Sequence, residues 1–296
     1  MRIREMAYYI NQVKFEECRL SLSTTTIGNI QAFKVAIPFL QNIPIFHKEI
    51  QEILAAELYS TSQDSLTFTT TSRAYNVYAD AIKVINKASL LLDLSNEIYP
   101  PLSENTISIK LPETSDMRAL YHSIKSFEQA FSILLTDDAI NSAISIENWE
   151  HGSFWINLYA GSALAVGVIS GTVWASAVIA NKYQEVKIHE QYVRSLNIKN
   201  ESLEDLLQAQ KELTDELINM ETRAIIDKHL GGSADQEKFE RVKLAIKTIA
   251  ELINQGAEIN PALDAPENVQ NLFPDFSRLD SIQSRIPRIV HKKNED

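Results

Sequence analysis

The chain has 296 residues, 45% of them hydrophobic and 23% charged, which excludes an intrinsically disordered protein and allows one large buried core or two smaller ones. Its formal net charge of −11 repels the phosphate backbone of nucleic acids, so we expect no nucleic-acid partner. The single cysteine excludes an intrachain disulfide, and the N-terminal residues contain no apolar run of signal-peptide length, so we expect a cytoplasmic protein.

Strand-like and helix-like segments alternate over residues 1–160. In four short segments apolar residues occupy every second position, which predicts strands with one face in water and argues against a doubly wound parallel sheet. The last of these segments, AISIENW followed by SFWINLY, predicts a β-hairpin whose turn contains Gly152. We therefore predict an α+β fold, with a two-layer domain over residues 1–160. One common buried face of its sheet is expected to contain Leu20, Ile109, Ile144 or Ile146, and Phe154.

Three helical regions separate the predicted strands. Residues 26–59 have a helical pattern that Pro38 and Pro44 must kink or divide. Residues 73–94 form a broad apolar helix. Residues 116–135 place apolar side chains three and four positions apart, which indicates a helix with one core-facing side.

The second half of the chain is mainly helical. Residues 161–197 fit one long helix, and two heptad-patterned helices, 202–229 and 237–255, flank a glycine turn and predict an antiparallel hairpin. Together they form a helical region over residues 161–259, followed by an extended tail over 260–296 that contains four prolines. The seam of the hairpin either packs inside one chain or is shared between subunits. Its expected residues are Leu213, Leu217, Ile246 and Ile249.

Between Glu150 and Lys182 the chain carries no Asp, Glu, Lys or Arg, and this stretch is long enough to cross a membrane as a helix. Small residues recur there at every fourth position, which favours close approach of the sheet, a second helix or another subunit. They are Ala163, Gly167, Gly171 and Ala175. Three interpretations stay open: a permanent membrane span, a core or subunit-interface helix, and a helix over 160–181 that inserts only after a trigger.

Sequence motifs of catalysis are missing. The chain has no GxSxG, Walker A, GxGxxG, HExxH or CxxC motif, and its six histidines are scattered. Glu185 and His189 lie one helical turn apart, a spacing that can bind a metal, but on a charged helix such a pair is usually solvated. We therefore expect no catalytic residue, no cofactor and no metal site, and we interpret Cys18 as a buried, unreactive thiol.

The layout of residues 141–180 resembles that of uncharacterised bacterial proteins encoded on mobile and phage-defence islands. It consists of a strand, the sequence GSFWINLY, and a helix rich in glycine, alanine and valine. The resemblance indicates no named family and transfers no functional residue. It implies that the protein belongs to a bacterial immunity or prophage module.

These features favour an oligomerising, non-enzymatic interaction module. In this hypothesis the α+β domain binds a partner, the helices assemble copies of the chain through coiled-coil contacts, and the protein takes part in anti-phage defence. The first alternative is a membrane-acting effector of the inner membrane whose helix 160–181 inserts. The second is an enzyme whose active site is assembled from scattered residues.

Overall fold

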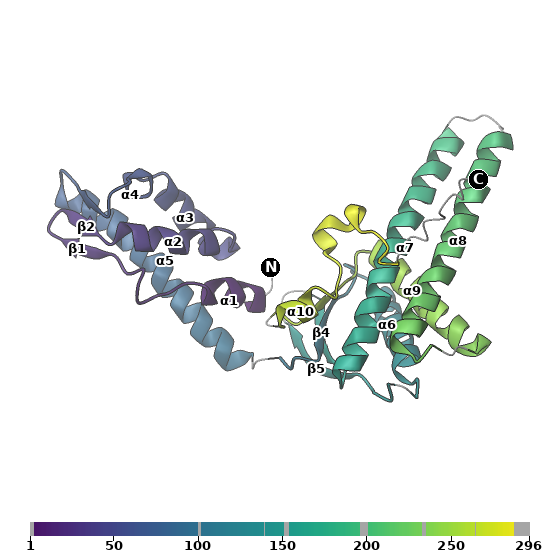
Figure 1. Ribbon diagram of the computed structural model, residues 1–296. Helices are drawn as coiled ribbons and strands as arrows, with labels where there is room; N and C mark the ends of the chain where they lie inside the picture. Colours follow the sequence, from purple (N-terminus) through teal and green to yellow (C-terminus); the bar gives the residue numbers. More distant parts are fainter. Residues whose placement is uncertain are drawn as a thin grey trace, which may run out of the picture. The chain divides into compact units, whose positions relative to one another are not determined.

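Two compact units, Met1–Pro101 and Leu102–Asp296, make up the computed structural model of the chain (Figure 1). The structure describes residues 3–99, 102–138, 140–150, 154–195, 201–232, 235–263 and 265–286. Each unit combines helices with a small sheet whose paired strands are all antiparallel, so the fold is α+β, as predicted.

Unit 1 packs short helices and a three-stranded sheet, of order β1-β2-β3, onto the long helix α5. Its elements are α1 (Ile3–Asn11), β1 (Ser21–Ser23), β2 (Thr26–Gly28), α2 (Ile30–Leu40), η1 (Pro44–Phe46), α3 (His47–Leu54), α4 (Glu57–Ser60), β3 (Ser65–Thr67) and α5 (Thr71–Ile98). Pro44 starts η1 and separates α2 from α3, as predicted, whereas Pro38 lies inside α2. Cys18 is buried in this unit, as expected.

A buried carboxylate joins two helices of unit 1. Oε1 of Glu49, on α3, lies 2.6 Å from Nζ of Lys87 and 3.4 Å from Nζ of Lys83, both on α5. The hydrogen bond from Lys87 is the main reason why the pKa of Glu49 is lowered to about 2. The charge of Glu49 is therefore compensated, which makes its burial tolerable.

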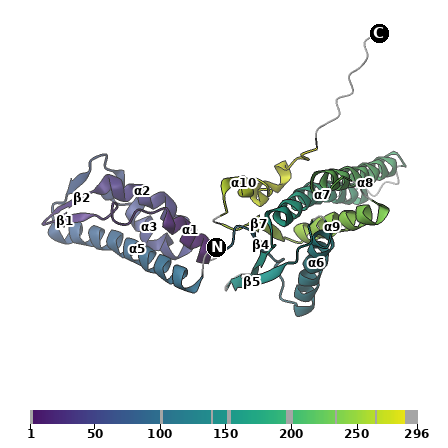
Figure 2. The same ribbon diagram turned by 60° about the horizontal axis from the view of Figure 1, so that its bottom comes forward.

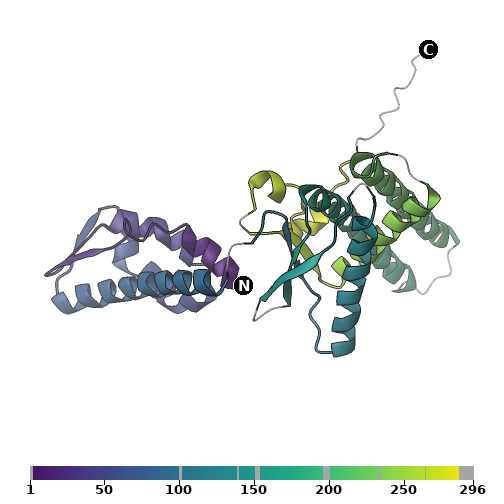
Figure 3. The ribbon, with the colours of Figure 1, turned by 90° about the horizontal axis from the view of Figure 1, so that it is seen from below.

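Unit 2 places helices on a four-stranded sheet of order β5-β6-β4-β7 (Figures 2 and 3). Its elements are β4 (Thr106–Lys110), α6 (Met117–Leu135), β5 (Ser145–Glu150), β6 (Trp155–Tyr159), α7 (Ala163–Ser195), α8 (Glu201–His229), α9 (Gln236–Asn254), β7 (Glu258–Pro261), α10 (Glu267–Gln270) and η2 (Phe276–Ser281). One core joins the isoleucines of β4 to α6, α7, α8 and α9. Strands β5 and β6 form the predicted hairpin, whose turn lies outside the described residues.

Helix α8 runs antiparallel to both of its neighbours. Asp215 contacts Lys247 and Arg223 contacts Phe239, so residue numbers rise along α8 as they fall along α9. His189 lies beside Gln210 and Gly171 lies against His229, so α7 and α8 are related in the same way. The α8–α9 pair is therefore the antiparallel hairpin predicted from the sequence.

The prediction of one common sheet is wrong. Leu20 is buried in the core of unit 1, whereas Ile109 is buried in the core of unit 2. Strands β1 and β3 each pair with β2, a short strand that the sequence pattern did not reveal. These three strands form a sheet of their own. Ile144 is half-buried, and Ile146 and Phe154 are exposed at the edge of the second sheet.

The prediction that one face of the sheet is exposed to water is also wrong at the centre of the second sheet. Ser108 and Asn157 are fully buried. The Ser108 hydroxyl donates to Oδ1 of Asn157 at 2.6 Å, and Nδ2 of Asn157 donates to Oδ1 of Asn148 at 2.6 Å. Alternation correctly identified a polar face, but that face satisfies its hydrogen bonds within the protein rather than with water.

The unit boundary differs from the predicted division at residue 160. Strand β4 pairs with both β6 and β7, so segments from all three expected regions share one sheet. The prediction of an extended tail is also wrong for the described residues of 260–286. These residues include the end of β7, α10 and η2, and they contribute side chains to the core of unit 2. Residues 287–296 lie outside the described part of the chain.

Candidate interaction surface

Helix α7 changes character along its length. Residues 165–180 are mostly buried in unit 2, whereas residues 184–195 are mostly exposed and run beside α8, and Figure 1 shows the two helices extending beyond the rest of the unit. Helix α7 is long and apolar enough to cross a membrane, but 72% of its most apolar window is buried inside the protein. A core helix has the same composition, so this helix by itself is weak evidence for a membrane protein.

The small residues of α7 face several different surroundings. Gly167 and Gly171 lie against the imidazole of His229, at the end of α8. A Cβ atom at Gly171 would stand 3.2 Å from Nε2 of His229, which is tighter than ordinary contact. Ala163 is exposed and Ala175 is buried in the core. The neighbour of the two glycines is therefore a side chain of the same chain.

Burial also affects His229 itself. Desolvation, assisted by the charge of neighbouring Lys228, lowers the pKa of this imidazole. The contact with Gly167 and Gly171 thus favours the neutral ring.

The predicted seam residues separate into two groups. Ile246 and Ile249, on α9, are fully buried, whereas Leu217 is half-buried and Leu213 is 64% exposed. Leu213 therefore does not take part in an intrachain core, which was one of the two interpretations of the seam. Helix α8 packs on both α7 and α9. Because it contacts two helices, the side of α8 that faces the core is rotated away from the heptad positions.

Threonines help to form the true core-facing side of α8. Thr214, Ile218 and Thr222 are buried there, followed by Ile225 and Ile226. The Thr214 hydroxyl donates to the carbonyl oxygen of Gln210 at 2.8 Å, and that of Thr222 to the carbonyl oxygen of Ile218 at 2.7 Å. These bonds within the helix satisfy the hydroxyls, so a polar residue occupies a core position. An apolar pattern cannot reveal such a position.

An apolar stripe remains on the outside of α8. Leu206, Leu213 and Met220 are 56%, 64% and 47% exposed and lie seven residues apart, so they project from nearly the same side of the helix. Leu217 lies beside them and is half-buried. We call these four residues the α8 stripe.

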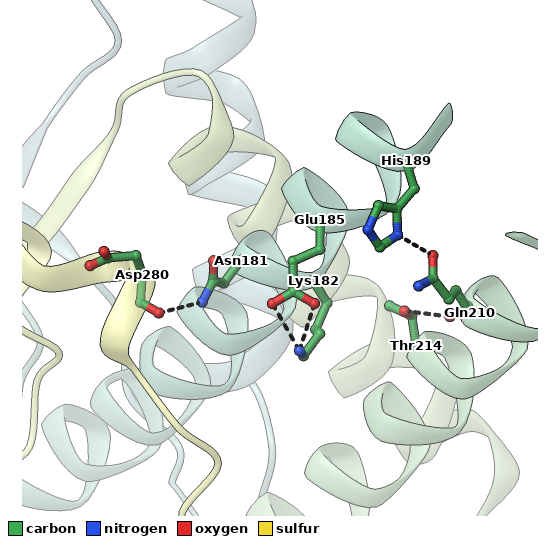
Figure 4. Close-up of polar contacts among 7 residues, drawn as sticks. All are labelled: Asn181, Lys182, Glu185, His189, Gln210, Thr214 and Asp280. Atoms are coloured by element: carbon green, nitrogen blue, oxygen red, sulfur yellow. Dashed lines mark hydrogen bonds and ion pairs between the residues drawn. The ribbon is translucent and has the colours of Figure 1, made fainter. Parts of the chain in front are cut away.

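A groove of about 430 Å³ lies along the α8 stripe, between α7 and α8. Its lining residues are Lys182, Glu185, Val186, Gln210, Leu213, Thr214, Glu216, Leu217 and Met220. Figure 4 shows the polar contacts that surround it. The ammonium of Lys182 lies 2.7 Å from a carboxylate oxygen of Glu185, and Nδ1 of His189 lies 2.8 Å from Oε1 of Gln210.

Glu185 and His189 each have a polar contact in Figure 4. Each of the two residues is engaged by another partner, and no group of three or more potential metal ligands occurs among the described residues. What the surface offers is a narrow apolar stripe between charged side chains. Such a surface suits packing against another helix.

A C-terminal strap, residues 276–286, contacts both α7 and α8. The carbonyl oxygen of Asp280 accepts from Asn181, and that of Gln283 accepts from the indole of Trp174 at 2.9 Å. The guanidinium of Arg285 stacks 3.2 Å from the centre of the Trp174 ring. These contacts thus hold α7 against the strap.

Glu221, on α8, lies beneath this strap. Its side chain is buried, the Ser284 hydroxyl bonds its carboxyl group, and its Oε1 has no hydrogen-bond partner among the described residues. Desolvation raises its pKa, so the folded state binds this proton more tightly than the unfolded chain does. Its favourable contribution is complete below the unfolded pKa and is lost as the pH rises through the folded pKa.

A Glu221→Gln variant is therefore expected to be more stable than the natural protein at pH 8, because the amide removes a buried charge and retains a partner for Ser284. At pH 4 the gain should be smaller, since the natural carboxyl group is then largely protonated. Thermal midpoints at the two pH values measure the difference. Equal gains at both would show that ionisation of Glu221 is not the cause.

Comparison with known proteins identifies a similar bacterial protein. No family model matches the chain, and no solved structure matches it. Over 292 residues the chain is 26% identical to "Uncharacterized protein YqaP" of Bacillus subtilis (strain 168), and the alignment covers 93% of each protein. The chain is therefore similar, along nearly its whole length, to an uncharacterised bacterial protein, in agreement with the resemblance found in the sequence.

Proposed function

We propose that this protein is a non-enzymatic interaction module that self-associates through the α8 stripe. The observation that carries the proposal is the exposure of Leu206, Leu213 and Met220 at heptad spacing. A heptad stripe is complementary to another helix with the same repeat, because apolar side chains of each helix enter spaces between those of the other. Of the two interpretations of the seam, the exposure of Leu213 favours the one in which subunits share the α8 side, whereas Ile246 and Ile249 are buried within the chain.

A double substitution tests this function. Leu213→Glu combined with Met220→Glu places two charges on the stripe, at positions that are exposed and hence tolerant of polar side chains in the monomer. Natural protein should associate in a concentration-dependent way, and the variant should remain a monomer over the same range. Mass photometry and analytical ultracentrifugation measure both states.

Leu244→Glu provides the matched control. Leu244 lies on α9, outside the stripe, and is 55% exposed, close to the exposure of the stripe residues. This variant should associate like the natural protein. A natural protein that stays monomeric at high micromolar concentration, or a double variant that associates equally well, would contradict the proposed function.

The proposal places the protein in the cytoplasm and, through the resemblance of residues 141–180, in anti-phage defence. Insertion of α7 into the inner membrane is the second candidate, and the length and apolar composition of this helix favour it. Insertion requires α7 to leave the core, where the Ser176 hydroxyl bonds the carbonyl oxygen of Ile246. Flotation of the purified protein with anionic vesicles would favour the second candidate over the first.

A further inference from the structure

The charges beside the α8 stripe distinguish between the two directions in which a second copy of α8 can dock. Glu216 and Arg223 are exposed on the same flank of α8 and lie seven residues apart. In a heptad with Leu213 and Met220 at one core position and Leu217 and Ala224 at the other, both occupy the flanking position that faces the partner helix. Because their charges are opposite, the electrostatic energy of a dimer depends on whether the two α8 helices run parallel or antiparallel.

A parallel pair would bring like charges together. In that arrangement each flanking residue faces the residue five positions later on the partner, so Arg223 would meet the exposed Lys228, whereas Glu216 would be directed at the position of Glu221, which is buried beneath the strap. The contact between Arg223 and Lys228 is repulsive and would occur twice by symmetry, while Glu216 would gain no opposite charge. The sequence of α8 therefore disfavours parallel docking.

An antiparallel pair brings opposite charges together. When Leu217 packs against Met220 of the second copy, Leu213 packs against Ala224, and the same register places Glu216 beside Arg223. A two-fold axis repeats every contact, so the dimer gains two such ion pairs. Gln210 and Asp227 then lie opposite each other at either end of the apolar stretch, which limits its length.

We propose that the protein forms an antiparallel homodimer through α8, in the register that pairs Glu216 of each copy with Arg223 of the other. The proposal rests on the proposed self-association and adds its direction and register. Arg223 is available for this contact: its guanidinium lies 6.0 Å from the ring centre of Phe239, and its side chain stays exposed. Among the described residues, no ion pair within the chain engages Glu216.

Charge reversal tests the arrangement. Glu216→Arg alone places arginine against arginine in both pairs, and Arg223→Glu alone places glutamate against glutamate. Each single variant should therefore dimerise on the order of tenfold more weakly than the natural protein, as measured by sedimentation equilibrium. An equimolar mixture of the two variants restores both opposite-charge pairs, so it should form mixed dimers with near-natural affinity.

The double variant, Glu216→Arg with Arg223→Glu, should also recover the natural affinity. Lys243→Glu and Glu240→Arg serve as controls, because they make the same changes of charge on α9, and Lys243 contacts the same Phe239 ring as Arg223. Both controls should dimerise normally. Circular dichroism confirms that each variant is folded.

The possible outcomes separate this inference from the proposed function. A parallel dimer would be tightened by Arg223→Glu, because the new glutamate would then face the exposed Lys228 of the partner. Tighter dimers, or mixtures no stronger than the single variants, would overturn the antiparallel arrangement even if Leu213→Glu with Met220→Glu abolishes association. Failure of that apolar double substitution to change the association would instead overturn the proposed function.

Discussion

Gly171→Leu is expected to destabilise unit 2 by on the order of 3 kcal/mol, because it overfills the contact between α7 and α8. A Cβ atom at this position would already stand 3.2 Å from Nε2 and 3.5 Å from Cδ2 of His229, and leucine adds three further carbons. The position is in the middle of a long helix, so the backbone cannot move locally to make room. Urea denaturation followed by far-UV circular dichroism measures the loss.

Gly167 provides the comparison. A Cβ atom there would lie 3.5 Å from His229, an ordinary van der Waals distance, so Gly167→Ala should be neutral or should stabilise α7 by up to about 1 kcal/mol. Removing the imidazole in a Gly171→Leu, His229→Ala double variant should recover part of the lost stability. If the single Gly171→Leu variant unfolds at the same urea concentration as natural protein, the close contact with His229 is not present in solution.

The sequence predicted the contact at Gly167 and Gly171 but could not identify its partner. Two glycines inside a helix lower its stability, so their four-residue spacing indicated a close neighbour. The neighbour, His229, is one of six scattered histidines, and nothing in its local sequence connects it to α7. Contacts between residues far apart in the chain depend on tertiary packing, which local patterns do not encode.

The helices were predicted more accurately than the sheets. Residues 116–135 and 161–197 match α6 and α7 closely, because a helix is a local structure with a period that apolar residues display. Strand pairing is not local, so four alternating segments were assigned to one sheet although they belong to two. Strand β2, which joins the first two segments, is too short to show a period.

Heptad spacing in α8 identified the apolar stripe but left its location open between the core and the surface. The pattern correctly selected Leu213 and Leu217 as members of one apolar stripe, but spacing does not state whether the stripe faces the core. The buried positions Thr214 and Thr222 were missed, since threonine is polar and its hydroxyl finds a backbone partner only once the helix exists.

The difference between stripe and core makes Ile218→Ala the most informative substitution in α8. Ile218 is fully buried between α8 and its neighbours, so its truncation should lower the free energy of unfolding by about 2–5 kcal/mol through lost burial and the cavity left behind. Leu217 is half-buried, and its truncation should cost less. Leu213 is exposed, and Leu213→Ala should change the stability of the monomer by less than about 0.5 kcal/mol.

These three alanine variants should be compared by urea denaturation at a protein concentration low enough for the monomer to predominate, since self-association would add to the apparent stability of the natural protein. At high concentration Leu213→Ala should then appear destabilising, because it weakens the dimer while leaving the monomer intact. The order Ile218, Leu217, Leu213 follows from burial on one helix, because alanine has a higher helix propensity than isoleucine or leucine and the losses therefore reflect burial. A reversed order, with Leu213→Ala costing most at low concentration, would place the stripe in the core and remove the surface on which self-association depends.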